Sequence, residues 1–341
     1  MYRQIAACLV VCFFVVLTNY ASAQSRYRVN NNPGVSADFT DLASAIAGSA
    51  AGDTLVIEHS DVAYNVAEVE INIELVIYGT GFFLVDNPGN QADIRASQLG
   101  PINITANGVV VSGLSITDAR INANSVVFER NYVSSTLTVG DAGPTKFNIV
   151  RQNYMRATVP DLVDVVNSIS MKFHNNLLWN ETDILGDPTA TNLIISASSA
   201  AMIYNNVFYG SATVLLNNVQ LDNNVFEESV IDPLSTNIAA SSNFAENSFL
   251  SLYQPTDNIV ETDSTFEVLS IASRDAQFGL RTDIPNALLN AGSDGTDVGI
   301  FGGQFSYVLS GMPPIPSIYF YEQETSSDGD LEIQIKTKTN K

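Results

Sequence analysis

An asparagine that recurs about every 23 residues is the feature that most constrains how this chain can fold. In six segments an apolar residue stands three positions before the asparagine, and another stands two positions after it. The six are Asn131, Asn153, Asn176, Asn206, Asn224 and Asn247, with steps of 22, 23, 30, 18 and 23 residues. Self-similarity at a fixed period of this length indicates a stack of repeated structural units.

The composition of each repeat favours strands and turns. Short β-branched and apolar runs alternate with Asn, Gly, Asp and Ser, and few windows after Gly52 have a helical period. A repeat of about 22 residues suits one coil of a right-handed parallel β-helix, whose strands pair with those of the next coil about 4.8 Å away. An inward asparagine in each coil can bond the backbone and its counterpart one coil on, so we expect the six to form a ladder. An antiparallel β-sandwich with ordinary asparagine turns is the alternative.

Residues 1–23 are predicted to be a secretory signal. Arg3 supplies the positive charge, Ile5–Leu17 is an uninterrupted apolar stretch, and Ala21–Ala23 gives the small residues of a cleavage site. An uncleaved anchor is the alternative. Cleavage would place the protein outside the cell, at the cell surface or in the periplasm, with no membrane span remaining. Both cysteines lie in this segment, so the mature chain would have no disulfide, thiol nucleophile or cysteine metal site.

The amino-acid composition excludes some classes of binding partner and a disordered chain. The chain has 36 acidic and 15 basic residues, a net charge of -21, which disfavours nucleic acid because phosphate binding needs clustered Lys and Arg. Hydrophobic residues make up 45%, enough for a sizeable core and too many for a disordered acidic tail.

The remaining chain divides into three parts. Residues 24–53 are expected to form an N-terminal strand and a capping helix, with Asp38 or Thr40 as the N-cap. Residues 54–310 are expected to form the β-helix, with about ten or eleven coils of about 22 residues each. Residues 311–341 form a tail that contains a β-hairpin, since an Asp-Gly turn separates two alternating runs.

Two segments resemble a known family. The run from Phe39 to Tyr64, with Gly52-Asp53-Thr54-Leu55, resembles the opening of pectin-lyase-fold proteins. The run from Leu288 to Gly303 is similar to the closing coil of secreted bacterial right-handed β-helix repeat proteins, and Pro313–Pro316 resembles the tail that follows it. The resemblance covers about residues 27–318. It implies the fold but leaves the activity open, because this fold hosts lyases, hydrolases, adhesins and spacers.

One column of side chains is the first candidate site. The position two residues before each repeated asparagine holds Glu129, Arg151, His174, Tyr204, Asp222 and Ala245 on successive coils, and the first five can carry polar chemistry. These side chains would point outward about 5 Å apart. The first three are candidate catalytic residues, and Tyr204 and Asp222 are candidate ligand-binding residues. The plainer interpretation is a solvated strand face with an ordinary ion pair.

Two loops supply the other candidates. The longest insertion carries the only tryptophan, Trp179, followed by Glu181, Asp183 and Asp187, which could stack on and bind a sugar; simple packing of Trp179 is the alternative. Asp294 and Asp297 could hold Ca²⁺, but the spaced Asp/Asn set and distal Glu of a full Ca²⁺ loop are absent. A structural turn is the favoured interpretation, because the segment falls in the expected closing coil.

No functional class is fixed by these residues. The Asp-Asp and Gly-His-Gly motifs of polygalacturonase-like hydrolases are absent, so no family site residue can be transferred. We therefore expect a secreted or cell-surface β-helix protein that is non-catalytic and binds polysaccharide or another surface component. A polysaccharide lyase or glycoside hydrolase acting on the lateral face and a structural spacer are the alternatives. The sequence calls for no cofactor apart from the weakly supported Ca²⁺, and it does not give the oligomeric state.

Overall fold

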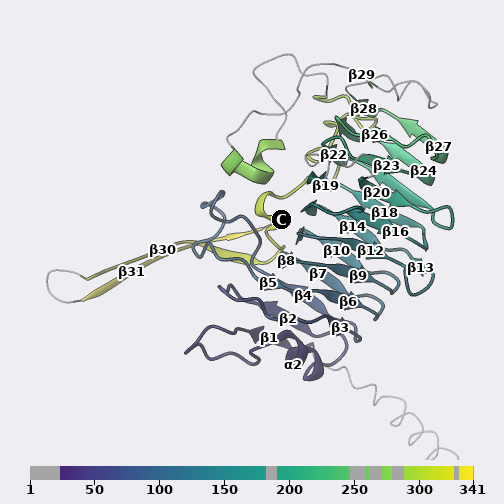
Figure 1. Cartoon of the computed structure of the whole chain (residues 1–341). Helices are drawn as coiled ribbons and strands as arrows, with labels where there is room; N and C mark the ends of the chain where they lie inside the picture. Colours follow the sequence, from purple (N-terminus) through teal and green to yellow (C-terminus); the bar gives the residue numbers. More distant parts are fainter. Residues whose placement is uncertain are drawn as a thin grey trace, which may run out of the picture.

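The chain winds into a solenoid with three long parallel sheets (Figure 1). The computed structural model describes residues 24–181, 190–245, 259–260, 271–278, 288–325 and 330–340. The predicted signal segment lies outside these residues, as do Asp183, Asp187 and Asn247. No helix among the described residues is long and apolar enough to cross a membrane.

Each sheet takes one strand from successive coils. Sheet A consists of β1 (Arg26–Val29), β2 (Thr54–Ile57), β4 (Val76–Tyr78), β7 (Val110–Ser112), β10 (Val127–Glu129), β14 (Ile149–Arg151), β18 (Met171–His174), β21 (Ala201–Tyr204), β24 (Asn217–Asp222) and β27 (Thr236–Ser241). Sheet B consists of β3 (Val69–Ile71), β6 (Ile102–Ile104), β9 (Ala119–Ile121), β12 (Leu137–Val139), β16 (Val163–Val165), β20 (Thr191–Ile195), β23 (Thr213–Leu215) and β26 (Val230–Ile231). Sheet C consists of β5 (Gln98–Leu99), β8 (Ser115–Ile116), β11 (Tyr132–Val133), β15 (Tyr154–Ala157), β19 (Leu177–Asn180), β22 (Val207–Tyr209), β25 (Val225–Glu227), β28 (Phe244–Ala245) and β29 (Ile259–Val260). A short pair, β13 (Thr145–Lys146) and β17 (Ser168–Ile169), joins two neighbouring loops.

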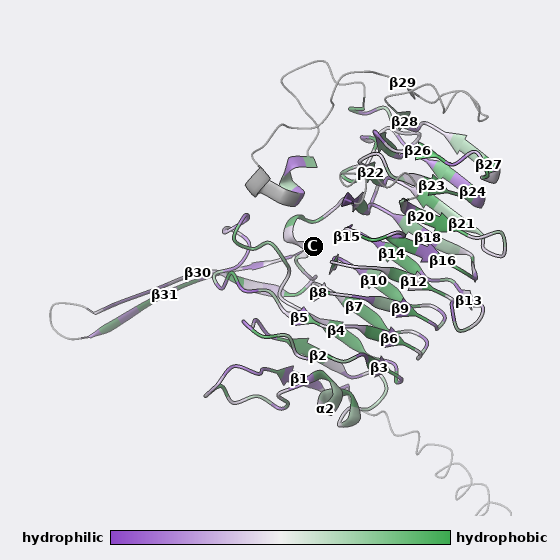
Figure 2. Cartoon of the chain, in the orientation of Figure 1, coloured by the Kyte–Doolittle hydropathy of each residue, from purple (hydrophilic) through white to green (hydrophobic). Residues whose placement is uncertain are grey.

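Every pairing among these strands is parallel and places equivalent residues side by side. Phe128 of β10 pairs with Val150 of β14, which pairs with Phe173 of β18. Apolar side chains therefore stack on apolar side chains along the axis and fill the coil. Figure 2 shows the hydrophobic residues along the strands of the solenoid. The predicted parallel β-helix is confirmed, and the antiparallel sandwich is wrong.

An asparagine ladder runs along one corner of the coil. After the first member, each ladder oxygen accepts from the backbone N–H of the asparagine one coil before it, at 2.9 to 3.1 Å, and also from that residue's side-chain amide. The oxygen of the first member, Asn131, accepts from the backbone N–H of Leu114. Each Nδ2 also donates to a backbone carbonyl. The members are Asn131, Asn153, Asn176, Asn206, Asn224 and Asn243, all with no exposed surface. The ladder thus satisfies turn groups that the tight corner buries.

The sixth ladder position differs from the prediction. Asn243, not Asn247, follows Asn224, at a step of 19 residues. This coil has Ala240 and Ala245 at the positions where the other repeats have larger apolar residues. Phe244 stands three positions before Asn247, where the repeat has its first apolar residue, and this led to the wrong assignment. In the structure Phe244 lies in the hydrophobic cluster outside the coil, beside Val225.

A short helix caps the first coil. Helix α2 (Leu42–Ala47) buries Leu42, Ala45 and Ile46 in the main core, which closes the end of the solenoid. Its N-cap is Asp41, whose side chain accepts from the backbone N–H of Ser44 at 2.8 Å. The predicted N-caps, Asp38 and Thr40, were wrong by one to three residues.

The C-terminal part does not continue the coil. Residues 288–316, here called the strap, run back along the corner between sheets A and C, from the level of β24 to that of β4. The strap includes the 3-10 helix η4 (Leu309–Gly311), and a second one, η3 (Ile271–Phe278), contacts it. Phe278, Leu288, Ile300 and Tyr307 pack on sheet C residues in a second hydrophobic cluster outside the coil. The expectation that residues 288–303 form the closing coil was therefore wrong, because their apolar side chains cover an outer face instead.

A long hairpin follows the strap. Strands β30 (Pro316–Thr325) and β31 (Leu331–Thr339) pair antiparallel and project away from the solenoid (Figure 1). The sequence predicted both strands, but the observed ones are longer.

Candidate functional site

The predicted side-chain column exists, but the strap lies over its middle and two of its members are buried. Glu129, Arg151, His174, Tyr204 and Asp222 occupy register positions on five neighbouring strands of sheet A. Glu129 and His174 are only 4% and 1% exposed. Phe305 of the strap lies over the column, since its ring centroid is 4.5 Å from Arg151 Cζ and 5.6 Å from the His174 ring. The predicted solvated lateral face is thus an interface between the coil and the strap.

The contacts within the column are those of a structural network. Arg151 binds the Glu129 carboxylate, with Nε to Oε2 at 2.6 Å, and His174 stacks on Tyr204 with ring centroids 4.5 Å apart. Burial lowers the pKa of His174 to about 4, so the ring is neutral at pH 7. Asp222 accepts from Gln220 at 2.6 Å. His174 is thus a buried, neutral ring that lies between Arg151 and Tyr204 on neighbouring strands.

Trp179 also packs within the protein. Its ring lies 4.9 Å from that of Tyr209 and 6.4 Å from that of Phe278. Arg156 Cζ stands 4.1 Å from the Trp179 centroid and its guanidinium binds Glu181 at 2.6 Å. Trp179 and Glu181 therefore belong to a half-buried stack on sheet C, which matches the packing alternative.

Asp294 and Asp297 are used in local turn bonds. Asp294 accepts from the backbone N–H and the hydroxyl of Thr296, at 3.0 and 2.7 Å, and the hydroxyl bond lowers the pKa of Asp294. Asp297 accepts from the backbone N–H of Asn290 at 2.9 Å. No group of three or more His, Cys, Asp or Glu that could hold a metal occurs in the described part of the chain.

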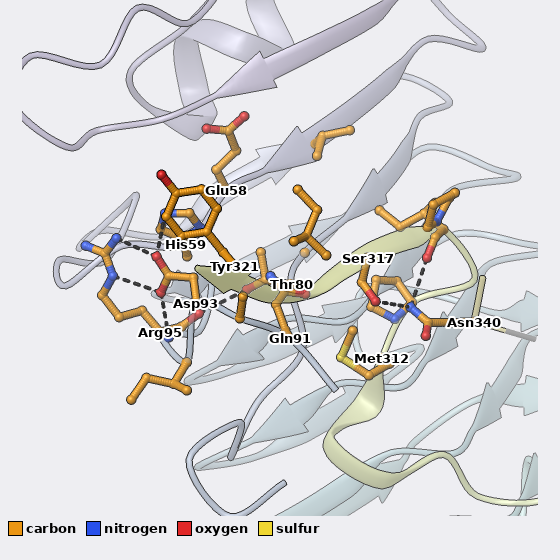
Figure 3. A pocket seen from close by; sticks show the side chains of 18 of the residues that line it. Glu58, His59, Thr80, Gln91, Asp93, Arg95, Met312, Ser317, Tyr321 and Asn340 are labelled. Atoms are coloured by element: carbon orange, nitrogen blue, oxygen red, sulfur yellow. Dashed lines mark hydrogen bonds and ion pairs between the residues drawn. The ribbon is translucent and has the colours of Figure 1, made fainter. Parts of the chain in front are cut away.

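The structure forms a different site, which sequence reasoning missed. A hollow of about 880 Å³ lies where the first coils of sheet A meet residues 91–95, the end of the strap and the base of the hairpin. Its polar wall carries Arg26, Glu58, His59, Asp93 and Arg95. The rest of the lining is mainly apolar and includes Met312, Pro313, Ile315, Pro316, Ile318 and Tyr321. Figure 3 shows Tyr321 of the hairpin near His59, Asp93 and Arg95 of the coil.

A connected set of ion pairs fixes the polar wall. Asp93 binds His59 Nε2 at 2.8 Å and Arg95 Nη2 at 2.7 Å (Figure 3). Arg95 also reaches Asp61 at 3.2 Å. Partial burial raises the pKa of Asp93, but hydrogen bonds from Arg95 outweigh this and leave it below its ordinary value. The carboxylate is thus ionised at neutral pH.

Glu58 is held in the same way. Its oxygens accept from Arg28 Nε and Asn30 Nδ2, both at 2.5 Å. Burial raises the pKa of Glu58, yet these bonds leave the net pKa below its ordinary value. The hollow therefore presents two ionised carboxylates held by hydrogen bonds, the bound guanidinium of Arg95 and the exposed Arg26 beside an apolar surface.

Comparisons with known proteins do not assign the chain to a family. No protein-family model and no curated protein sequence matches the chain. Among solved structures, the chain is similar to pectate lyase Pel9A, with a TM-score of 0.39 and 14% identity over 82% of this chain and 96% of that one.

Proposed function

We propose that the protein binds carbohydrate in the hollow beside the hairpin, as a secreted or cell-surface protein that carries out no reaction on its ligand. The observation that supports this proposal is the pairing of two unlike walls in one hollow. Carboxylates and guanidinium groups suit the hydroxyls of a sugar, while Tyr321 and the proline-rich wall suit its C–H faces. Polar groups that are already fixed cost little ordering entropy on binding.

The protonation states favour binding over hydrolysis. A glycoside hydrolase needs one carboxyl whose pKa is raised, so that it can protonate the leaving oxygen. Here the pKa values of both Asp93 and Glu58 lie below their ordinary values because cations and amides bind them.

A polysaccharide panel tests the proposal. Immobilised polygalacturonate, xylan and a β-glucan are incubated with the protein, and the affinity for any retained polymer is then measured by calorimetry. Arg95→Ala and Tyr321→Ala should each weaken that affinity at least tenfold. Arg120→Ala is the matched control, since Arg120 forms ion pairs with Glu68 and Asp141 on sheet B, outside the hollow. Retention on none of the polymers, or equal effects of all three variants, would refute the proposal.

One observation favours a second candidate, a polysaccharide hydrolase. The 2.8 Å contact between His59 and Asp93 is an arrangement that can activate water as a general base. Release of reducing ends from any polymer of the panel, abolished by His59→Asn and retained in Arg120→Ala, would establish this activity. Unsaturated uronide absorbance instead would indicate a lyase.

A further inference from the structure

The hairpin leaves an apolar face and a strand edge uncovered. In the antiparallel register, Tyr321 pairs with Ile335, Gln323 with Ile333 and Thr325 with Leu331, so these side chains share one face. Leu331, Ile333 and Ile335 are 56%, 49% and 53% exposed. In the described part of the chain β31 pairs only with β30, which leaves its outer edge open. A two-stranded hairpin alone is marginally stable, and an open edge is a template for another strand.

The sequence of β31 is complementary to itself when it is reversed. Centred on Gln334, an antiparallel copy places Glu332 opposite Lys336, Ile333 opposite Ile335 and Leu331 opposite Thr337. Direct cross-strand partners lie on the same face, so Glu332 meets Lys336 and Ile333 meets Ile335, while Leu331 meets the methyl-bearing Thr337. A one-residue shift would break this match by facing charged against apolar side chains.

Within one chain the charges of the hairpin are not matched. Glu324 of β30 pairs directly with Glu332 of β31, and like charges at such a position are destabilising. The reversed copy would bring a lysine beside this acidic pair. The lysine of the second copy would therefore offset the repulsion between Glu324 and Glu332.

We propose that β31 pairs antiparallel with β31 of a second copy of this chain, about a two-fold axis through Gln334. The two hairpins then form a four-stranded sheet, β30-β31-β31-β30, with the isoleucines of both copies side by side on one face. Such a contact is isologous, so it closes at the dimer and does not propagate into fibres. It is independent of the ligand proposed for the hollow.

Charge reversal tests the register. Sedimentation of the wild-type protein at micromolar concentrations should show a dimer. Glu332→Lys and Lys336→Glu should each raise the dimer dissociation constant at least tenfold, and the double variant should restore it. Glu324→Lys is the matched control, because it relieves the same Glu324–Glu332 repulsion but does not lie on the open edge. A wild-type monomer at 100 µM, or a dimer that is insensitive to both single reversals, would overturn the proposal.

Cross-linking tests the axis independently. In a Cys8→Ser/Cys12→Ser background, which leaves no other cysteine in the sequence, Gln334→Cys should give a covalent dimer on mild oxidation. Gln323→Cys on β30 is the control and should remain monomeric on a denaturing gel. Equal cross-linking of the two variants would indicate random collision and count against the two-fold axis.

Discussion

The interior of the coil and the strap outside it are both bound by the same turns, through consecutive residues whose side chains point to opposite sides. Asn176 lies in the internal ladder, whereas its neighbour Asn175 points outward and donates to the carbonyls of Ile300 and Gly302 in the strap, both at 2.9 Å. The same division applies to Asn153 and Gln152, whose side chain donates to strap carbonyls. The outward residue has a left-handed backbone, with φ of 53° for Asn175 and 56° for Gln152.

The comparison shows how one local motif serves two interfaces. The left-handed residue turns the chain sharply, so that adjacent side chains lie on opposite sides of the wall. The internal side repeats from coil to coil because each coil stacks on a copy of itself. The outer side binds an irregular segment, so its residues vary among Arg130, Gln152, Asn175, Asn205 and Asn223. If the two sides serve different interfaces, changes on the internal side should cost more stability than changes on the strap side. Four predictions test this difference.

Removing one ladder side chain should have the largest effect. Asn176→Ala leaves the backbone N–H of Asn153 without its acceptor and removes one bond each from the Asn153 side-chain amide, the Val150 carbonyl and the Asn206 oxygen. Because buried unpaired groups cost roughly 1 to 3 kcal/mol each, the free energy of unfolding should fall by about 3 kcal/mol or more. Urea denaturation measures it. A loss below about 1 kcal/mol would contradict the importance assigned to the ladder.

The second largest effect is expected in the pH dependence of the free energy of unfolding, through His174 in the column under the strap. The pKa of His174 falls from 6.5 to about 4 on folding because burial disfavours its charged form. The unfolded chain therefore binds the proton more readily, and stability present above pH 6.5 is lost as the pH falls toward 4. The loss is roughly 3 kcal/mol, taking about 1.4 kcal/mol per pKa unit. Denaturation at pH 7 and pH 4 should show it, and His174→Gln should reduce the difference; an unchanged difference would remove His174 as its cause.

The strap should respond to acid in the opposite direction. Burial raises the pKa of Asp275 to about 6, although it accepts from the Ser310 backbone N–H at 2.6 Å. The folded state therefore holds the proton more tightly than the unfolded state. This contribution strengthens attachment of the strap as the pH falls from about 6 toward 4. Amide exchange at Ser310, corrected for intrinsic rates, should slow relative to the sheet amides, and Asp275→Asn should remove the trend. Faster corrected exchange at pH 5 than at pH 7 would contradict the assignment.

The smallest effect is expected for the outward neighbour of the first variant. Asn175→Ala removes two hydrogen bonds to the strap but leaves the ladder intact. We expect a loss of about 1 to 2 kcal/mol, with faster amide exchange confined to the strap and its contacts. An effect as large as that of Asn176→Ala would show that coil and strap unfold as one unit.

The sequence predicted those parts of the structure that repeat. The ladder positions from Asn131 to Asn224, the neighbouring strands of the column and both hairpin strands could be read from spacing, because stacking a coil on its copy converts periodicity into contact. The prediction failed where the repeat was imperfect, at Asn243, and where segments far apart in the sequence meet. No spacing relates His59 to Asp93 or Tyr321, so the hollow left no signal in the sequence beyond ordinary polar residues.

By itself, then, the sequence determined the parallel solenoid, since an inward amide at a fixed interval satisfies buried turn groups only when coils stack in register. Only the tertiary structure decided which outer surfaces are open. The strap returns over Glu129, Arg151 and His174 because its apolar side chains need a surface to cover, and that return buries one face while its far end helps to enclose the hollow at the first coils.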